Sequence, residues 1–136
     1  MKLYLILFAL VVVGVSTQSQ SGQSPAELRS KAGALAKDGN WKEALEVSRV
    51  VLDTVDDRDS GKDLMDSLRY LRELRQVADA DELIESAVSK HSSNWGLLRQ
   101  AAKSYQQLQH SGFLLDGEFR RGYHRGGGSY VECMGR

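Results

Sequence analysis

Residues 24–55 decide the fold, and they read SPAELRSKAGALAKDGNWKEALEVSRVVLDTV. Ser24–Glu27 supplies a hydroxyl at the N-cap, a proline at the first helical position and a carboxylate at the third, a pattern that predicts the start of a helix. We expect this helix to run to about Asp38 and to stop at Gly39.

Residues 40–43 repeat this start signal, with the amide of Asn40 as the cap. The apolar residues that follow recur at steps of three and four, which places them on one face of a second helix. They are Trp41, Ala44, Leu45, Val51, Leu52 and Val55. The two segments therefore predict a helical hairpin with a very short turn.

Three more helices are expected further along the chain. The acidic stretch 53–63 predicts a connection that also caps the next helix, whose apolar stripe extends from Leu64 to Ala78. Residues 79–82 form a third capping box ahead of a short fourth helix. The polar residues 91–94 break the pattern, and a fifth helix follows from Trp95 to Leu108. No useful length alternates with period two, so no sheet is expected in this region.

The first hairpin resembles a tetratricopeptide repeat. The matching features are small residues where paired helices touch, an aromatic residue just after the turn and an alanine beyond it. They are found at Leu28, Ala32, Leu35, Gly39, Asn40, Trp41, Ala44 and Leu45. Residues 64–90 and the start of the fifth helix match less well, and the closing proline of such repeats is absent. The resemblance implies an all-α fold of stacked antiparallel hairpins that bury one another's apolar faces.

Composition bounds the function class. The 136 residues contain 18 basic and 18 acidic side chains, 41% hydrophobic residues and one cysteine. This average composition predicts one ordinary globular domain. Zero net charge provides no global field for nucleic acid or anionic membrane, and one cysteine cannot close an internal disulfide.

The N-terminus predicts export. Lys2 precedes the unbroken apolar run Leu3–Val15, which small or polar residues follow, as in a secretory signal peptide. The run is shorter than the ~20 residues that span a bilayer, so we expect cleavage near residue 17, a secreted or periplasmic product and no stable membrane span. We divide the chain into a signal peptide (1–17), a flexible spacer (18–23), a helical-hairpin domain (24–110) and a tail (111–136).

Residues 111–131 of the tail contain six of the 13 glycines and four aromatic residues. Because each glycine costs a helix about 1 kcal/mol relative to alanine, we expect an irregular segment that packs Phe113, Leu114, Phe119 and Tyr123 back on the helices. An arginine-glycine nucleic-acid segment and a phosphate-binding loop are weaker interpretations of the same residues. The candidate interaction residues are Phe119, Arg120, Arg121, Tyr123, His124 and Arg125.

A second resemblance involves residues 93–131. Asn94-Trp95 opens a helix, Tyr105 lies near its end, and residues 117–128 read GEFRRGYHRGGG. This region resembles the N-terminal helical region of large secreted bacterial proteins of the alpha-2-macroglobulin family. That family traps proteases by collapsing around an attacker that cleaves a bait segment. The sequence departs from the family because it lacks the macroglobulin β-sandwich domains, the bait and the thioester; Cys133 has Arg136, and no glutamine, three residues on.

Candidate chemical sites are weak. Asp57, Asp59 and Gly61 suggest a calcium loop, but the glycine falls at position five, so a solvated acidic connection is favoured. His91, His110 and His124 lack metal-ligand spacing and are expected at the surface or at helix caps.

The remaining candidates are also interpreted as structural. A Cys133–His124 nucleophile and base has no third orienting group, and a lone exported cysteine is better placed to pair between chains. Trp41 and Trp95 are expected to be packing residues. We predict no cofactor and no metal.

The sequence therefore predicts a non-enzymatic, exported protein-interaction module. One interpretation is the N-terminal part of an alpha-2-macroglobulin-like protease trap, whose partner is the downstream part of a longer chain. The alternative is an independent tetratricopeptide-like scaffold that binds a peptide or an envelope protein. Neither interpretation involves nucleic acid.

Overall fold

The computed structural model describes residues 22–123 and 125–132. The predicted signal peptide, most of the predicted spacer, His124 and Cys133 lie outside these residues.

The first two helices form the predicted hairpin. Helix α1 is Pro25–Lys37 and helix α2 is Trp41–Thr54. The predicted capping box of α1 is confirmed: the Ser24 side chain accepts from the Glu27 amide at 3.3 Å, and the Ser24 amide donates to the Glu27 carboxylate at 2.8 Å. Asn40 occupies the N-cap of α2, but its side chain makes no capping hydrogen bond.

Helices α3 (Ser60–Glu73), α4 (Ala80–Lys90) and α5 (Trp95–Gln107) follow, with a short 3-10 helix η1 (Val77–Asp79) before α4. The predicted acidic connection is shorter than expected, because residues 53–54 belong to α2 and residues 60–63 to α3. The third capping box is wrong, since Asp79 makes no side-chain capping bond. Asn94 does cap α5, where its side chain accepts from the Leu97 amide at 3.0 Å.

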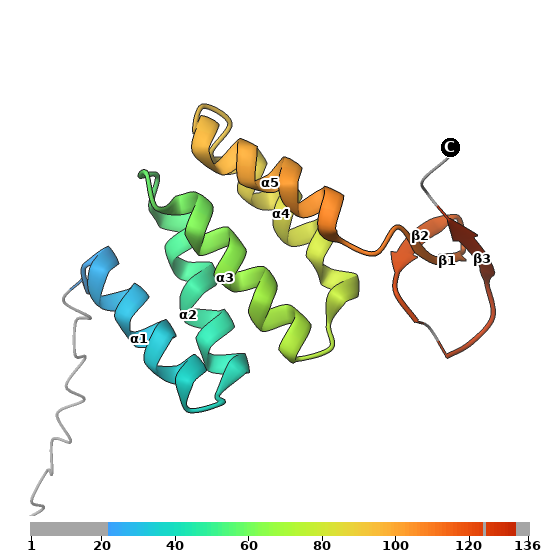
Figure 1. The fold of residues 1–136 in the computed structure, drawn as a ribbon, viewed down its shortest axis with the longest axis horizontal. Coiled ribbons are helices and arrows are strands. Elements are labelled where there is room, and N and C mark those ends of the chain that lie inside the picture. The colour runs from blue at the N-terminus through green and yellow to red at the C-terminus, as the bar shows by residue number, and fades with distance from the viewer. Residues whose placement is uncertain (1–21, 124, 133–136) are drawn as a thin grey trace, which may run out of the picture.

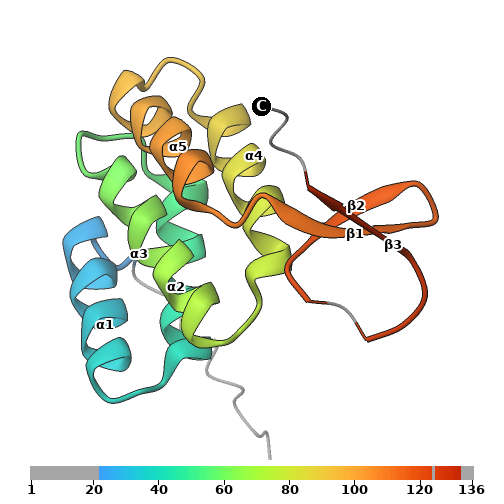
Figure 2. The ribbon, with the colours of Figure 1, turned by 45° about the vertical axis from the view of Figure 1, so that its right-hand side comes forward.

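The five helices pack in two layers (Figure 1). Helices α1, α3 and α5 lie side by side in front, and α2 and α4 lie behind them. The view in Figure 2 shows the same packing from a second direction. The largest fully buried apolar side chains come from both layers, among them Val51, Leu64, Leu71, Ile84 and Leu97. The mostly helical prediction is confirmed. No helix in the described part of the chain is long and apolar enough to cross a bilayer.

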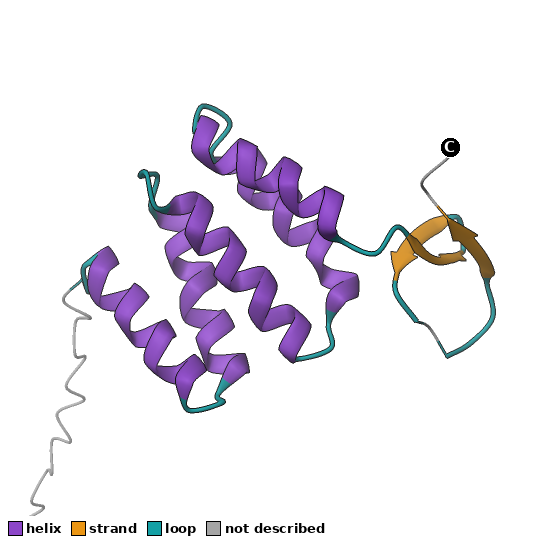
Figure 3. Ribbon diagram, in the orientation of Figure 1, coloured by secondary structure: helices purple, strands orange, loops and turns teal. Residues whose placement is uncertain are grey.

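The tail forms a small antiparallel sheet (Figure 3). The prediction of an irregular segment is therefore wrong. Strands β1 (Ser111–Leu115), β2 (Glu118–Arg121) and β3 (Ser129–Glu132) pair in the order β2-β1-β3. The reason is the turn Asp116-Gly117, whose φ angles of 51° and 86° match a tight hairpin. This dipeptide pairs Leu114 with Phe119 across the hairpin.

Strand β2 contacts η1 and ties the sheet to the helices through Arg121. The Arg121 side chain, 8% exposed, donates to both carboxylate oxygens of Asp81 at 3.0 and 2.8 Å and also to the carbonyl of Gln109. Tyr123 is 84% exposed, so its predicted packing on the helices is wrong, and Leu114 is also exposed. The sheet lies beyond the end of α5 and leaves the length of the α1/α3/α5 layer uncovered (Figures 1 and 2).

Candidate functional site

Two open hollows border helix α3, one toward α1 and one toward α5. We call them the α1–α3 hollow and the α3–α5 cavity; their volumes are about 150 and 470 Å³. Asp66 and Arg69 line both, so the hollows adjoin along one surface of α3. Both hollows lie on the α1/α3/α5 side of the helices, whereas a smaller hollow of about 100 Å³ lies between α2 and α4.

The α1–α3 hollow is polar and largely committed to internal contacts. Its floor comes from Ser48 and Val51 of α2, and the Ser48 hydroxyl lies 2.7 Å from that of Ser67. One wall is Arg29, whose guanidinium donates to Asp57 at 2.9 and 2.8 Å and to Asp63 at 3.0, 3.0 and 2.7 Å.

This charge network holds three parts of the chain together. Hydrogen bonds to Asp63 and then to Asp57 raise the pKa of Arg29, and the hydrogen bond from Arg29 lowers the pKa of Asp57. Arg29 is on α1, Asp57 is in the connection, and Asp63 is on α3 with only 7% of its side chain exposed. The network therefore fixes α1 against α3.

The lowered pKa of Asp57 predicts acid sensitivity. Because the folded-state pKa lies below the ordinary value near 3.8, the stabilisation is complete above that value and is lost as pH falls through the folded pKa. Asp57→Asn should therefore be less stable than wild type at pH 7, and the difference should shrink below about pH 4. Urea unfolding of both proteins at pH 7 and at low pH measures it. Asp59→Asn, in the same connection, is the control, and its difference in stability from wild type should not shrink at low pH.

The α3–α5 cavity has an apolar lining. Side chains of α3, η1, α4 and the residue after α5 supply it: Met65, Leu68, Leu71, Val77, Ala80 and Leu108. Ser104 also lines the cavity, but its hydroxyl donates to the carbonyl of Gln100 at 2.9 Å and contacts the sulfur of Met65 at 3.3 Å. The apolar side chains therefore form the greater part of the lining, and the other polar residues that line the cavity are Asp66, Arg69, Arg72, Gln107 and Gln109.

Cations and amides border this apolar lining. Arg69, Arg72, Gln107 and Gln109 are exposed residues of the lining. The Arg69 guanidinium lies 3.4 Å from Asp66 and 5.2 Å from the centre of the Tyr70 ring. Arg72 has no ion-pair partner among the described residues. Asp66 also lines the cavity, so its charged lining consists of two arginines and one aspartate and is positive on balance.

The two helix layers differ in charge although the whole chain is neutral. Helices α1, α3 and α5 contain eight Lys and Arg against four Asp and Glu. Helices α2 and α4 contain three Lys and Arg against six Asp and Glu. The contoured layer is thus basic and the opposite layer acidic, a difference that net charge conceals.

Of the acidic residues considered for calcium, Asp57 is engaged in internal contacts, whereas the Asp59 side chain is exposed. Asp57 accepts from Arg29 and from the Asp59 amide, and Gly61 is buried in α3. A Cβ at Gly61 would lie 3.1 Å from the carbonyl oxygen of Gly96, so glycine here allows α3 and α5 to approach. No group of three metal-ligand side chains occurs in residues 22–123 and 125–132.

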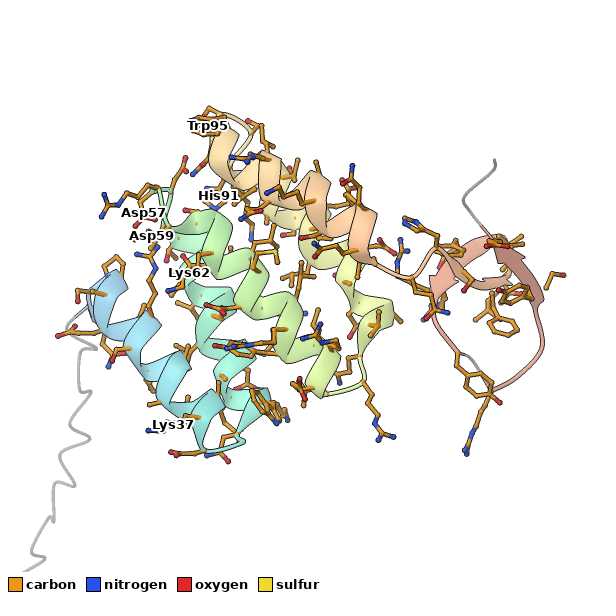
Figure 4. All side chains as sticks on the ribbon, in the orientation of Figure 1. Lys37, Asp57, Asp59, Lys62, His91 and Trp95 are labelled. Carbon is orange, nitrogen blue, oxygen red and sulfur yellow. The ribbon has the colours of Figure 1, made fainter. Side chains whose placement is uncertain are left out.

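His91 is buried, not at the surface as one expectation had it, although it does occupy the C-cap of α4. Its Nε2 lies 2.5 Å from the Leu52 carbonyl oxygen, to which it donates, and its Nδ1 lies 3.7 Å from Asp56. Figure 4 shows His91 at the same end of the molecule as Asp57, Asp59 and Trp95. The two described histidines, His91 and His110, are separated by 19 positions in the sequence. The Cys133–His124 pair lies outside the described residues.

The two tryptophans differ. Trp41 packs on the core, with its ring centre 6.1 Å from that of Tyr70. Trp95, by contrast, is 74% exposed, so the prediction that it is a packing residue is wrong. It projects from the start of α5 at the end of the molecule (Figure 4).

The predicted tail residues are not brought together into one site. Arg121 is buried against Asp81, with its guanidinium 5.5 Å from the centre of the Phe119 ring. Arg120 points to the opposite face of β2, as alternation requires, and is 3.9 Å from Glu118. Tyr123 and Arg125 are exposed in the loop between β2 and β3. Arg121 thus has a structural role. None of the candidate residues named from the sequence lines the α3–α5 cavity.

Comparison with known proteins adds no assignment. No family model, no curated protein and no solved structure matches the chain. The resemblances to tetratricopeptide repeats and to the alpha-2-macroglobulin family therefore stay predictions.

Proposed function

We propose that this chain is a non-enzymatic protein-interaction module, exported from the cell, and that its α1/α3/α5 layer binds a segment of a partner protein. The observation that supports this best is the α3–α5 cavity, an apolar hollow of about 470 Å³ on a basic helical surface that the sheet leaves uncovered. Hollows of this size accept ligand groups, and a few anchor side chains in such a pocket supply most of the affinity of a protein interface.

The lining favours binding over catalysis. Among the residues that the structure describes, no histidine or cysteine lines either hollow. The Ser48 hydroxyl is hydrogen-bonded to Ser67, and the Ser104 hydroxyl donates to a backbone carbonyl. Neither serine has the neighbouring base that a nucleophile requires. The acids of the α1–α3 hollow face Arg29 and Arg69 at ion-pair distance.

Both interpretations of the sequence share this contact role. A scaffold would bind a separate peptide or envelope protein, and the front part of an alpha-2-macroglobulin-like trap would contact downstream domains of the same chain. The genomic sequence distinguishes them. A continuous frame into β-sandwich domains with a Cys-x-x-Gln motif supports the trap, whereas an unrelated neighbouring gene supports the scaffold.

Site-specific photocrosslinking tests the proposed surface. A benzophenone amino acid at Gln107, on the edge of the α3–α5 cavity, should yield a discrete crosslinked product in the cells that make the protein. The same amino acid at Glu46, exposed on α2, is the matched control and should yield none. Gels and mass spectrometry read out the result. Products of equal abundance from both positions, or none from either, would contradict the proposal.

A further inference from the structure

The occupant of the α3–α5 cavity can be specified from its charges. Its lining is mainly apolar, and its one carboxylate, Asp66, is paired with Arg69, so the group that enters the cavity is expected to be apolar. Its edge offers two exposed arginines of α3, Arg69 and Arg72, which are the sequence neighbours of the buried residues Tyr70 and Leu71. The entering segment must therefore present an apolar side chain between polar or acidic groups, which are compatible with the arginines at the edge.

We propose that the α3–α5 cavity binds an acidic protein segment through one apolar anchor side chain, with Arg69 and Arg72 contacting the carboxylates that flank the anchor. This inference rests on the proposed function and names the partner class of the same surface. Arginine suits the role because its planar guanidinium pairs with carboxylates in a bidentate geometry.

The two arginines differ in how far they are already engaged. Arg72 is exposed and has no ion-pair partner among the described residues. Arg69 is paired with Asp66, but at 3.4 Å and with its side chain 48% exposed, a geometry that contributes little in water. A ligand carboxylate that contacts Arg72 therefore meets an available cation. A carboxylate that contacts Arg69 displaces only the weak surface ion pair with Asp66.

The rest of the layer continues the attraction. Lys62 lines the adjoining α1–α3 hollow, and α5 contains Arg99 and Lys103 but no acidic residue. An acidic segment that enters at the α3–α5 cavity thus meets cations along α3 and α5. The acidic α2/α4 layer repels the same segment, which directs it to one face of the protein.

Selection from a phage-displayed library of random peptides tests this partner class on the full protein. The expected result is enrichment of peptides in which Leu, Ile, Met or Phe is flanked by Asp or Glu. A synthetic fluorescent copy of the enriched sequence should bind more weakly as salt rises. Enrichment of basic or uncharged peptides would overturn the inference and leave the proposed function standing. Failure to enrich any peptide would contradict both.

Charge-reversal variants locate the site. Arg69→Glu and Arg72→Glu should each weaken binding of the fluorescent peptide about tenfold or more, measured by anisotropy. Lys42→Glu, an exposed charge reversal on α2, is the matched control and should leave the affinity unchanged. Circular dichroism checks that each variant is folded. Val77→Trp adds an uncharged test, because an indole in the cavity should block the anchor. Undiminished binding by the folded Arg72→Glu and Val77→Trp variants would overturn the inference.

Discussion

Arg29→Met is expected to lower the free energy of unfolding by about 3 kcal/mol. The substitution removes five hydrogen bonds from one guanidinium to two carboxylates and leaves Asp63, 7% exposed, without its counter-ion. A buried charge that loses its partner keeps its desolvation cost, which is why the loss exceeds that of a surface pair. Urea unfolding at pH 7 measures the change.

Two further variants separate the network from the packing of α1. Lys31→Met, an exposed change on the same helix, should leave the free energy of unfolding within about 0.5 kcal/mol of wild type. Adding Asp63→Leu to Arg29→Met should restore part of the stability, because the uncompensated charge is then gone. An Arg29→Met protein as stable as the Lys31→Met control would show that α1 does not depend on the network.

Gly112→Val is expected to unfold the sheet while the five helices remain. A Cβ at Gly112 would lie 2.8 Å from the Phe119 ring and 2.9 Å from the Arg120 carbonyl carbon, and would contact the carbonyl oxygen. Because that oxygen belongs to the backbone of β2, the strand must move away from β1. Such overpacking costs about 1–3 kcal/mol, which is large for a three-stranded sheet.

The readout is local. Amide hydrogen exchange in residues 111–121 should accelerate to that of an unstructured peptide, whereas far-UV circular dichroism at 222 nm should change little. Gly127→Ala is the matched control, because nothing lies within 4 Å of a Cβ there and its φ is not positive. Unchanged protection in Gly112→Val, or equal loss in Gly127→Ala, would contradict the packing described for β1 and β2.

Much of the helical part was predictable because its signals are local. Ser24, Pro25 and Glu27 satisfy the first amides of α1 whatever the rest of the chain does, and the apolar spacing in α2 selects its buried face. The cap predictions at Asn40 and Asp79 failed for a related reason. Residue type makes a capping bond available, but the backbone angles of the folded chain decide whether the side chain reaches the amide.

The sheet was missed although its strongest signal is local. Counting glycines predicted the loss of helix but not what replaces it, and the turn dipeptide Asp116-Gly117 was the available indication of a hairpin. The pairing of β1 with β3 depends on residues about 17 positions apart, so no local pattern reports it.

The site was missed because it is assembled from distant segments. Arg29 meets Asp63 across 34 positions, and the α3–α5 cavity combines α3, η1, the start of α4, the end of α5 and the residues after it. One signal was accessible: the excess of Lys and Arg over Asp and Glu in the first and fifth helices, which could have marked the basic layer before the structure was known.

We propose that partner binding takes place at the α3–α5 cavity. An NMR titration of the ¹⁵N-labelled protein with the peptide enriched by selection tests it most directly. We expect amide shifts to change in residues 65–72, 77–80 and 104–109, which surround the cavity. Shift changes confined to α2, the rest of α4 or the β2-β1-β3 sheet, with unchanged amide shifts in residues 65–72, 77–80 and 104–109, would contradict binding at the cavity.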